Sequence, residues 1–164
     1  TEEANLVKGK IENVAPISER LDTLLRNMVD PSTGRADYRV ANEYVSSVEN
    51  FTMINPKAAE AAPLLYKAAE VARSIRLHQR ALDIYETICE QYPDYEKAGK
   101  AYFMRAFTLD EDLKKPEEAR KMYQAFIDKF PNDDFADDAQ ILLDNIGKSE
   151  EEIFQQFEKQ RQEQ

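Results

Sequence analysis

Two stretches of the sequence, ALDIYETICEQYPDY (residues 81–95) and ARKMYQAFIDKFPND (residues 119–133), repeat one pattern 38 residues apart. Each begins with alanine, places tyrosine four residues later and reaches proline eight residues after that. The apolar positions recur at intervals of three and one, which is the spacing of one face of an α-helix. Proline ends each pattern because it lacks the N–H that the helix would use. The two stretches therefore predict two equivalent amphipathic helices.

A weaker third copy precedes these two. Pro56 lies 37 residues before Pro93, and Tyr44 stands in an apolar stripe upstream of it. A fixed period of this size is typical of repeat proteins, in which each helical hairpin buries its apolar face against the next. A single helical bundle is the alternative, but a bundle needs no fixed period.

Further amphipathic segments lie between the three copies. Together they predict one domain over residues 1–164, built from four helical hairpins at residues 17–54, 57–92, 95–130 and 133–161. Residues 30–35 are expected to form a turn, and Gly147 to end a helix. Ser149 and Glu152 have the spacing of a capping box at the start of the last helix.

These residues resemble the tetratricopeptide repeat. Its pattern has a small residue midway in the first helix, alanine early in the second, an aromatic residue four positions later and proline near the end. One repeat places Ala69, Ala81, Tyr85 and Pro93 there, and the next places Ala106, Ala119, Tyr123 and Pro131. The resemblance implies an all-α, right-handed superhelix of about four hairpins.

Two features depart from the repeat pattern. Arg105 stands where the pattern prefers an apolar residue. The interval from Ala106 to Ala119 is also one residue longer than the interval from Ala69 to Ala81.

The helix ends EQYPDY (residues 90–95) and DKFPNDDFADDAQILLDNIG (residues 128–147) are also similar to those of periplasmic tetratricopeptide proteins of the bacterial cell envelope. Those proteins include outer-membrane assembly lipoproteins and coordinators of the Tol-Pal system. The resemblance implies a periplasmic or envelope location, with a lipid-anchored cysteine ahead of Thr1; a cytoplasmic location is the alternative.

The composition disfavours several classes of partner. The net charge is −10, from 32 acidic and 22 basic residues. Such a surface repels nucleic-acid phosphates and anionic lipid headgroups, so neither nucleic acid nor a membrane surface is an expected partner. No apolar run approaches the roughly 18 to 20 residues that span a bilayer. The single cysteine, Cys89, allows no internal disulfide and falls on an apolar stripe, where a thiol behaves as a small hydrophobic group.

The residues that often carry chemistry have simpler interpretations here. His78, the only histidine, has no nucleophile or orienting carboxylate among its sequence neighbours, and is expected to be an exposed linker residue. The acidic cluster at residues 133–138 lacks the glycine and alternating acids of a calcium loop, and acids in the first turn of a helix favourably meet its dipole. No catalytic residue, cofactor or metal ligand is predicted, and the chain is not expected to be an enzyme.

The positive functional signal comes from the resemblance. In tetratricopeptide proteins the first helix of each repeat lines a groove that binds a partner peptide or helix. The matching positions here are Tyr66, Lys67, Glu70, Arg73, Phe103, Met104, Phe107 and Asp110. Phe103, Met104 and Phe107 suit interface anchors, although they could instead pack against residues 141–143.

The predicted function is a protein–protein interaction scaffold. The alternative is a structural adaptor that self-associates through its convex face or through the C-terminal helix with Ile153, Phe154 and Phe157.

Overall fold

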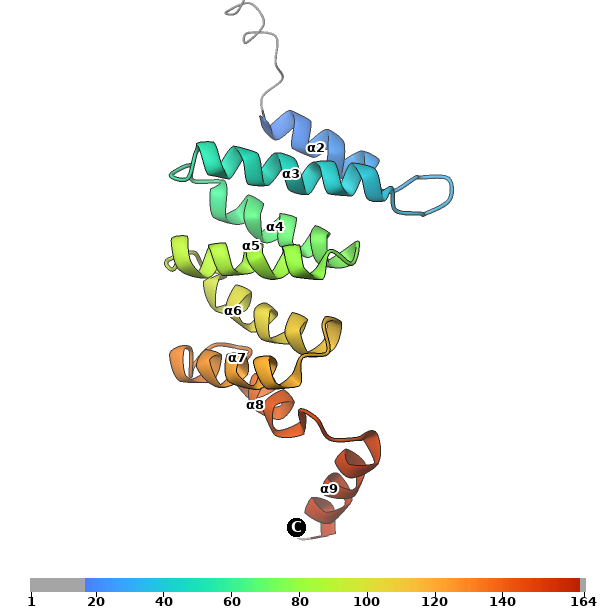
Figure 1. Cartoon of the computed structure of the whole chain (residues 1–164), viewed down its shortest axis with the longest axis vertical. Helices are drawn as coiled ribbons and strands as arrows, with labels where there is room; N and C mark the ends of the chain where they lie inside the picture. Colours follow the sequence, from blue (N-terminus) through green and yellow to red (C-terminus); the bar gives the residue numbers. More distant parts are fainter. Residues whose placement is uncertain (1–16, 163–164) are drawn as a thin grey trace, which may run out of the picture. The chain divides into compact units, whose positions relative to one another are not determined.

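The computed structural model describes residues 17–162, and this part of the chain contains eight α-helices and one π-helical turn (Figure 1). No strand occurs within the described residues; the one element of β structure among them is an isolated bridge between Val29 and Ala36. The predicted all-α class is therefore confirmed.

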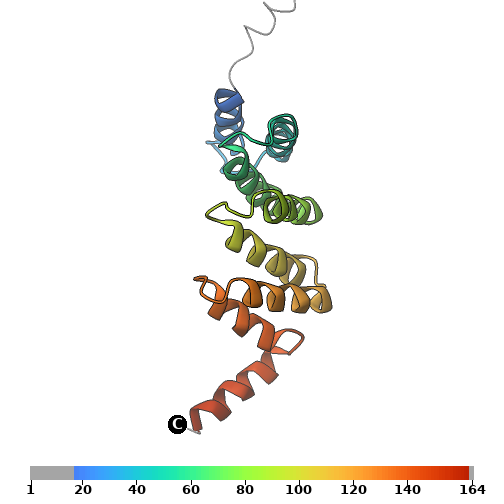
Figure 2. The ribbon, with the colours of Figure 1, turned by 90° about the vertical axis from the view of Figure 1, so that its left-hand side faces the viewer.

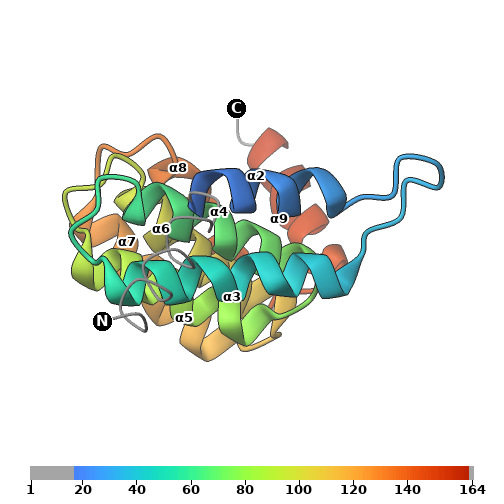
Figure 3. The ribbon, with the colours of Figure 1, turned by 90° about the horizontal axis from the view of Figure 1, so that it is seen from above.

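The described residues divide into two compact units, with the boundary between Ile75 and Arg76. The first contains α2 (Ile17–Asn27), α3 (Tyr38–Ile54) and α4 (Ala61–Ser74). Helix α3 packs against both α2 and α4, and Figure 3 shows α2 and α3 side by side. The most deeply buried side chains of this unit come from the apolar stripes of all three helices, and include Leu21, Tyr44, Val45, Val48 and Leu65.

The second unit contains a stack in which α5, α6, α7 and α8 pack on one another in succession. In chain order its elements are α5 (His78–Gln91), α6 (Ala98–Phe107), the π-helical turn η1 (Thr108–Asp112), α7 (Pro116–Lys129), α8 (Ala136–Asn145) and α9 (Glu150–Gln162). Contacts join α5 to α6, α6 to α7 and α7 to α8, and Figures 1 and 2 show these four helices in succession. The core between α6, α7 and α8 is aromatic and contains Phe103, Tyr123 and Phe126.

One turn geometry recurs at the ends of α3, α5 and α7. The residues that follow these helices are Asn55, Tyr92 and Phe130, with φ of −125°, −131° and −129° and ψ of 59°, 53° and 56°. In each turn, two further backbone hydrogen bonds of 2.8–3.1 Å span three residues apiece and lead into the next helix. Each helix ends two residues before Pro56, Pro93 or Pro131. The weak first copy of the sequence pattern thus has the same turn as the two strong copies.

Three local predictions are confirmed. Asp30 organises the turn at residues 30–35, because its carboxylate accepts hydrogen bonds from the N–H groups of Ser32 (2.7 Å) and Thr33 (3.1 Å). Gly147 has φ of +81°, a conformation that glycine adopts without strain, and α8 ends two residues before it. The capping box is formed by Ser149 N–H donating to Glu152 Oε2 (2.7 Å) and Glu152 N–H donating to Ser149 Oγ (3.3 Å).

The extra residue between Ala106 and Ala119 is accommodated by η1. Leu113 N–H donates to the carbonyl of Thr108 (3.0 Å), five residues earlier, and Lys115 N–H donates to Leu109 (2.8 Å), six residues earlier. Lys114 then takes a positive φ of 52° before α7 begins at Pro116. A one-residue insertion in a helix is commonly absorbed in this way, and such π-helical turns often lie at functional sites.

Candidate partner-binding cleft

A cleft of about 430 Å³ lies in the second unit where η1, the start of α7, the end of α8 and the start of α9 come together. Its lining combines apolar and charged side chains. The apolar residues are Pro116, Leu142, Ile146 and Ile153, and the polar ones are Asp110, Glu111, Lys114, Asn145 and Lys148. A mixed lining of this kind can bury an apolar side chain and orient the charges around it.

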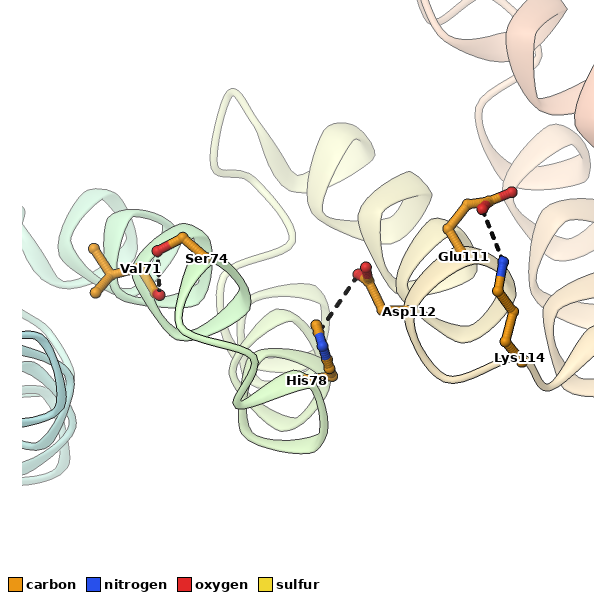
Figure 4. A network of polar contacts seen from close by, with 6 residues as sticks. All are labelled: Val71, Ser74, His78, Glu111, Asp112 and Lys114. Carbon is orange, nitrogen blue, oxygen red and sulfur yellow. Dashed lines mark hydrogen bonds and ion pairs between the residues drawn. The ribbon is translucent and has the colours of Figure 1, made fainter. Parts of the chain in front are cut away.

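The local sequence explains how these elements meet. Arg120 of α7 donates from Nη2 to the carbonyl of Ile146 (3.2 Å), which ties α7 to the turn after α8. Gly147 redirects the chain there, and the capping box starts α9 so that Ile153 lies at the cleft. On the opposite wall, Lys114 donates to Glu111 (3.0 Å), and this exposed pair can be followed in Figure 4.

Asp110 is the partly desolvated carboxylate of the cleft. Its pKa is raised above the ordinary value of 3.8, first by burial and then by the charge of Glu111, while Lys114 opposes the shift. The buried hydroxyl of Tyr123 makes no hydrogen bond of good geometry. Burial and then the charges of Asp110 and Glu111 raise the pKa of this phenol, and its closeness to Asp110 offsets part of the upward pKa shift of that carboxyl. Because its charge is incompletely solvated, Asp110 would gain from a cation brought by a ligand.

The three predicted groove residues of α6 are buried or half-buried. Phe103 is only 6% exposed, and its ring centroid lies 5.0 Å from that of Phe135 and 5.7 Å from that of Phe126. Met104 and Phe107 are half-buried and pack against the same core. Of the eight predicted groove residues, Asp110 is the one that lines the described cleft.

The other four predicted groove residues belong to α4 in the first unit. Tyr66 is buried, with 5% of its surface exposed, and Arg73 is half-buried. Lys67 and Glu70 are exposed and form an ion pair with each other at 3.4 Å. That all eight residues form one binding groove stays a prediction.

His78 is a correction to the sequence analysis. It is the first residue of α5, and its side chain is only 22% exposed. Its Nδ1 lies 3.7 Å from Oδ2 of Asp112 in η1 (Figure 4), so it does have a neighbouring carboxylate. The expectation of an exposed linker residue was wrong because the partner lies 34 residues away in the sequence. The separation is close to the period of 37 to 38 residues in the sequence, and this was the available signal.

The remaining candidates have structural roles. Asp133 accepts a hydrogen bond from the N–H of Phe135 (3.0 Å), and Asp137 and Asp138 lie in the first turn of α8. Within residues 17–162 no three acidic, histidine or cysteine side chains form a group that could hold a metal ion. Cys89 is buried, and this burial raises the pKa of its thiol, so little reactive thiolate forms near neutral pH.

No helix in the described part of the chain is long and apolar enough to cross a membrane.

Comparison with known families agrees with this geometry. A family model described as tetratricopeptide repeat matches residues 64–95 and 100–133. Both segments are thus similar to tetratricopeptide repeats. The predicted fold class, an all-α solenoid of the tetratricopeptide type, is thereby confirmed. Tetratricopeptide repeats generally mediate protein–protein interactions and are typically found in non-enzymatic scaffolds. No curated protein matches the chain.

Proposed function

We propose that this chain is a non-enzymatic scaffold that binds a partner peptide or helix at the cleft between η1, α8 and α9. The observation that carries the proposal is the cleft itself, which adjoins the second segment matched by the tetratricopeptide model and is lined by both apolar and charged residues. Clefts of this composition bind by burying one or two anchor side chains while rim charges set orientation.

The chemistry of the cleft specifies the kind of peptide that fits. Leu142 and Ile153 offer an apolar contact for an aliphatic or aromatic anchor. Asp110 is partly desolvated beside them, so a lysine or arginine near the anchor would restore the favourable environment of its charge. The net charge of −10 also increases the association rate of a basic partner. The preferred ligand is therefore a short segment with an apolar anchor next to a basic residue.

Peptide selection from a random displayed library tests this proposal. We expect selection on the full chain to enrich peptides with an apolar residue flanked by lysine or arginine. Titration calorimetry with an enriched peptide should show about tenfold weaker binding to Ile153→Ser and to Asp110→Asn. Ile54→Ser is the matched control, because Ile54 is 74% exposed on α3 and is not among the residues that line the cleft.

Two outcomes would contradict the proposal. Enriched peptides that bind both cleft variants as tightly as the unaltered chain would place the binding surface elsewhere. A chain that enriches no peptide would remove the basis for peptide recognition.

We also propose a location in the bacterial cell envelope, supported by the resemblance of residues 90–95 and 128–147 to periplasmic tetratricopeptide proteins. Fractionation of the native cells with immunoblotting should place the protein in the periplasm or envelope, and mass spectrometry should find a lipid on a cysteine ahead of Thr1. Recovery of an unmodified protein from the cytoplasm would contradict this.

The proposed single domain over residues 1–164 would unfold in one cooperative transition by circular dichroism. Two separate transitions would contradict it.

A further inference from the structure

Helix α8 carries an exposed apolar residue at the position where α6 carries a buried one. The same turn precedes both helices, so that Ala98 of α6 corresponds to Ala136 of α8. Counting along both helices, Phe103 corresponds to Ile141. Phe103 is 6% exposed, whereas Ile141 is 55% exposed.

Phe103 and Ile141 differ in exposure because of the helices that follow them in the chain, α7 and α9. Helix α7 packs along α6, and the ring of Phe103 lies 6.0 Å from that of Tyr123 in α7. Helix α9 is the corresponding partner for α8, but among the described residues it does not pack along α8 in this way. Figures 1 and 2 show α9 leading away after the turn at residues 146–149. Phe154 on α9 is itself 66% exposed.

We propose that the exposed face of α8 is covered by α9 of a second copy of this chain, and that the exchange is reciprocal. Each copy would then supply one α9 and receive another, which closes as a two-fold dimer. Phe154 would pack on Ile141 of the second copy, as the aromatic residues of α7 pack on Phe103 within one copy.

The charges at the helix ends agree with this pairing. An antiparallel arrangement, like that of α7 on α6, places the end of α9 beside the start of α8. The last turn of α9 contains Lys159 and Arg161, and the first turn of α8 contains Asp137 and Asp138. Opposite charges therefore meet along the proposed contact.

A second copy fits better than the chain's own α9. The start of that helix is held at the cleft side of α8, because Ile153 lines the cleft together with Leu142 and Lys148. Gly147 and the capping box at Ser149 fix the direction in which α9 leaves. The chain's own α9 thus starts away from Ile141, whereas the α9 of a second copy has no such constraint.

Charge reversal distinguishes an α9 that packs on α8 of a second copy from an α9 that folds back on α8 of its own chain. One variant carries Asp137→Lys and Asp138→Lys; the other carries Lys159→Glu and Arg161→Glu. We expect size-exclusion chromatography with light scattering to report a dimer for the unaltered chain and at least tenfold weaker dimerisation for each variant. An equimolar mixture of the two variants should recover the dimer, because both of its contacts again join opposite charges. Lys57→Glu, a reversal on an exposed residue of the first unit, should leave the dimer intact.

The Ile141→Ser variant gives a second test that does not depend on charge. Because Ile141 is exposed, the variant should keep the helical circular dichroism of the unaltered chain while dissociating at least tenfold more readily. Any of three results would overturn the proposal. The first is a monomeric unaltered chain, and the second is a dimer that none of the variants weakens. The third is a dimer that returns when all four charge substitutions are in one chain but not in the mixture of the two variants, which would show that α9 folds back on its own α8.

Discussion

Helices α6 and α8 begin alike and end differently. Both follow the same turn, and Ala101 and Ala139 occupy corresponding positions with no exposed surface. Helix α6 continues through η1 to Asp112, so its C-terminal turns cover α5 and α7. Helix α8 ends at Asn145, because the chain reaches Gly147 in a left-handed conformation.

This difference shows that the burial of a residue in a repeat protein is determined by the next helix. Phe103 and Ile141 are both large and apolar, and both lie on regular helices. One belongs to the core and the other to the surface, because only the first is covered. Stability in such folds depends on contacts between neighbouring helices. The last helix of the stack, here α8, therefore has no following helix that covers it.

The largest expected effect comes from truncating the two corresponding residues. Phe103→Ala removes a ring that contacts four other aromatic rings, and should lower the free energy of unfolding by about 3–5 kcal/mol. Ile141→Ala should change it by less than about 0.5 kcal/mol in the monomer. Urea denaturation measures both, in the Lys159→Glu/Arg161→Glu background so that dimerisation does not contribute. Equal losses at the two sites would show that Ile141 is covered in the monomer.

Thr108 offers an intermediate test of the end of α6. Its side chain is fully buried and its hydroxyl has no hydrogen-bond partner, while the corresponding residue after α8 is the apolar Ile146. Thr108→Val removes an unsatisfied buried polar group without changing the shape, and should raise the free energy of unfolding by about 1 kcal/mol. Thr52→Val is the control, because Thr52 Oγ1 donates to the carbonyl of Glu49 (3.1 Å) and its loss should lower stability. Thermal denaturation compares the two, and a loss at Thr108 would mean that the hydroxyl supports the π-helical turn.

The helices and their ends could be predicted from sequence because they depend on local chemistry. Each of these features depends on a few neighbouring residues. Examples are the apolar stripe around Tyr123, the end of the helix before Pro131 and the capping box at Ser149. The departure from the repeat pattern at Arg105 was also visible in the sequence, but its cause lies in another helix. Arg105 Nη2 pairs with Glu86 of α5, which allows a charged residue at a mostly buried position.

The cleft could not be predicted because it depends on how distant segments meet. The extra residue before Ala119 was visible in the sequence, but its conversion into a π-helical turn that presents Asp110 was not. The pairing of His78 with Asp112 was missed for the same reason. The burial of Phe103 also required knowing that α7 lies across it.

The smallest effect concerns Asp110, whose counterpart after α8 is Lys148. Burial raises the pKa of Asp110 in the folded protein, so its ionised form costs stability above that pKa. Below the ordinary value of 3.8 the carboxyl is protonated in both the folded and unfolded states, and the cost disappears. Asp110→Asn should therefore raise the free energy of unfolding at pH 7 by no more than about 1 kcal/mol, and the gain should vanish near pH 3.

Asp30 supplies a control of opposite sign. Hydrogen bonds from Ser32 and Thr33 lower its pKa, so its ionised form stabilises the fold at neutral pH and that stability is lost as the pH falls through the folded pKa. Asp30→Asn should lower the melting temperature at pH 7 and match the unaltered chain in strong acid. Melting curves of both variants between pH 2 and pH 8 measure the two trends. If Asp110→Asn were destabilising at pH 7, the contact of Asp110 with Tyr123 and Lys114 would outweigh its burial, and the cleft would lack the incompletely solvated charge that favours a basic ligand.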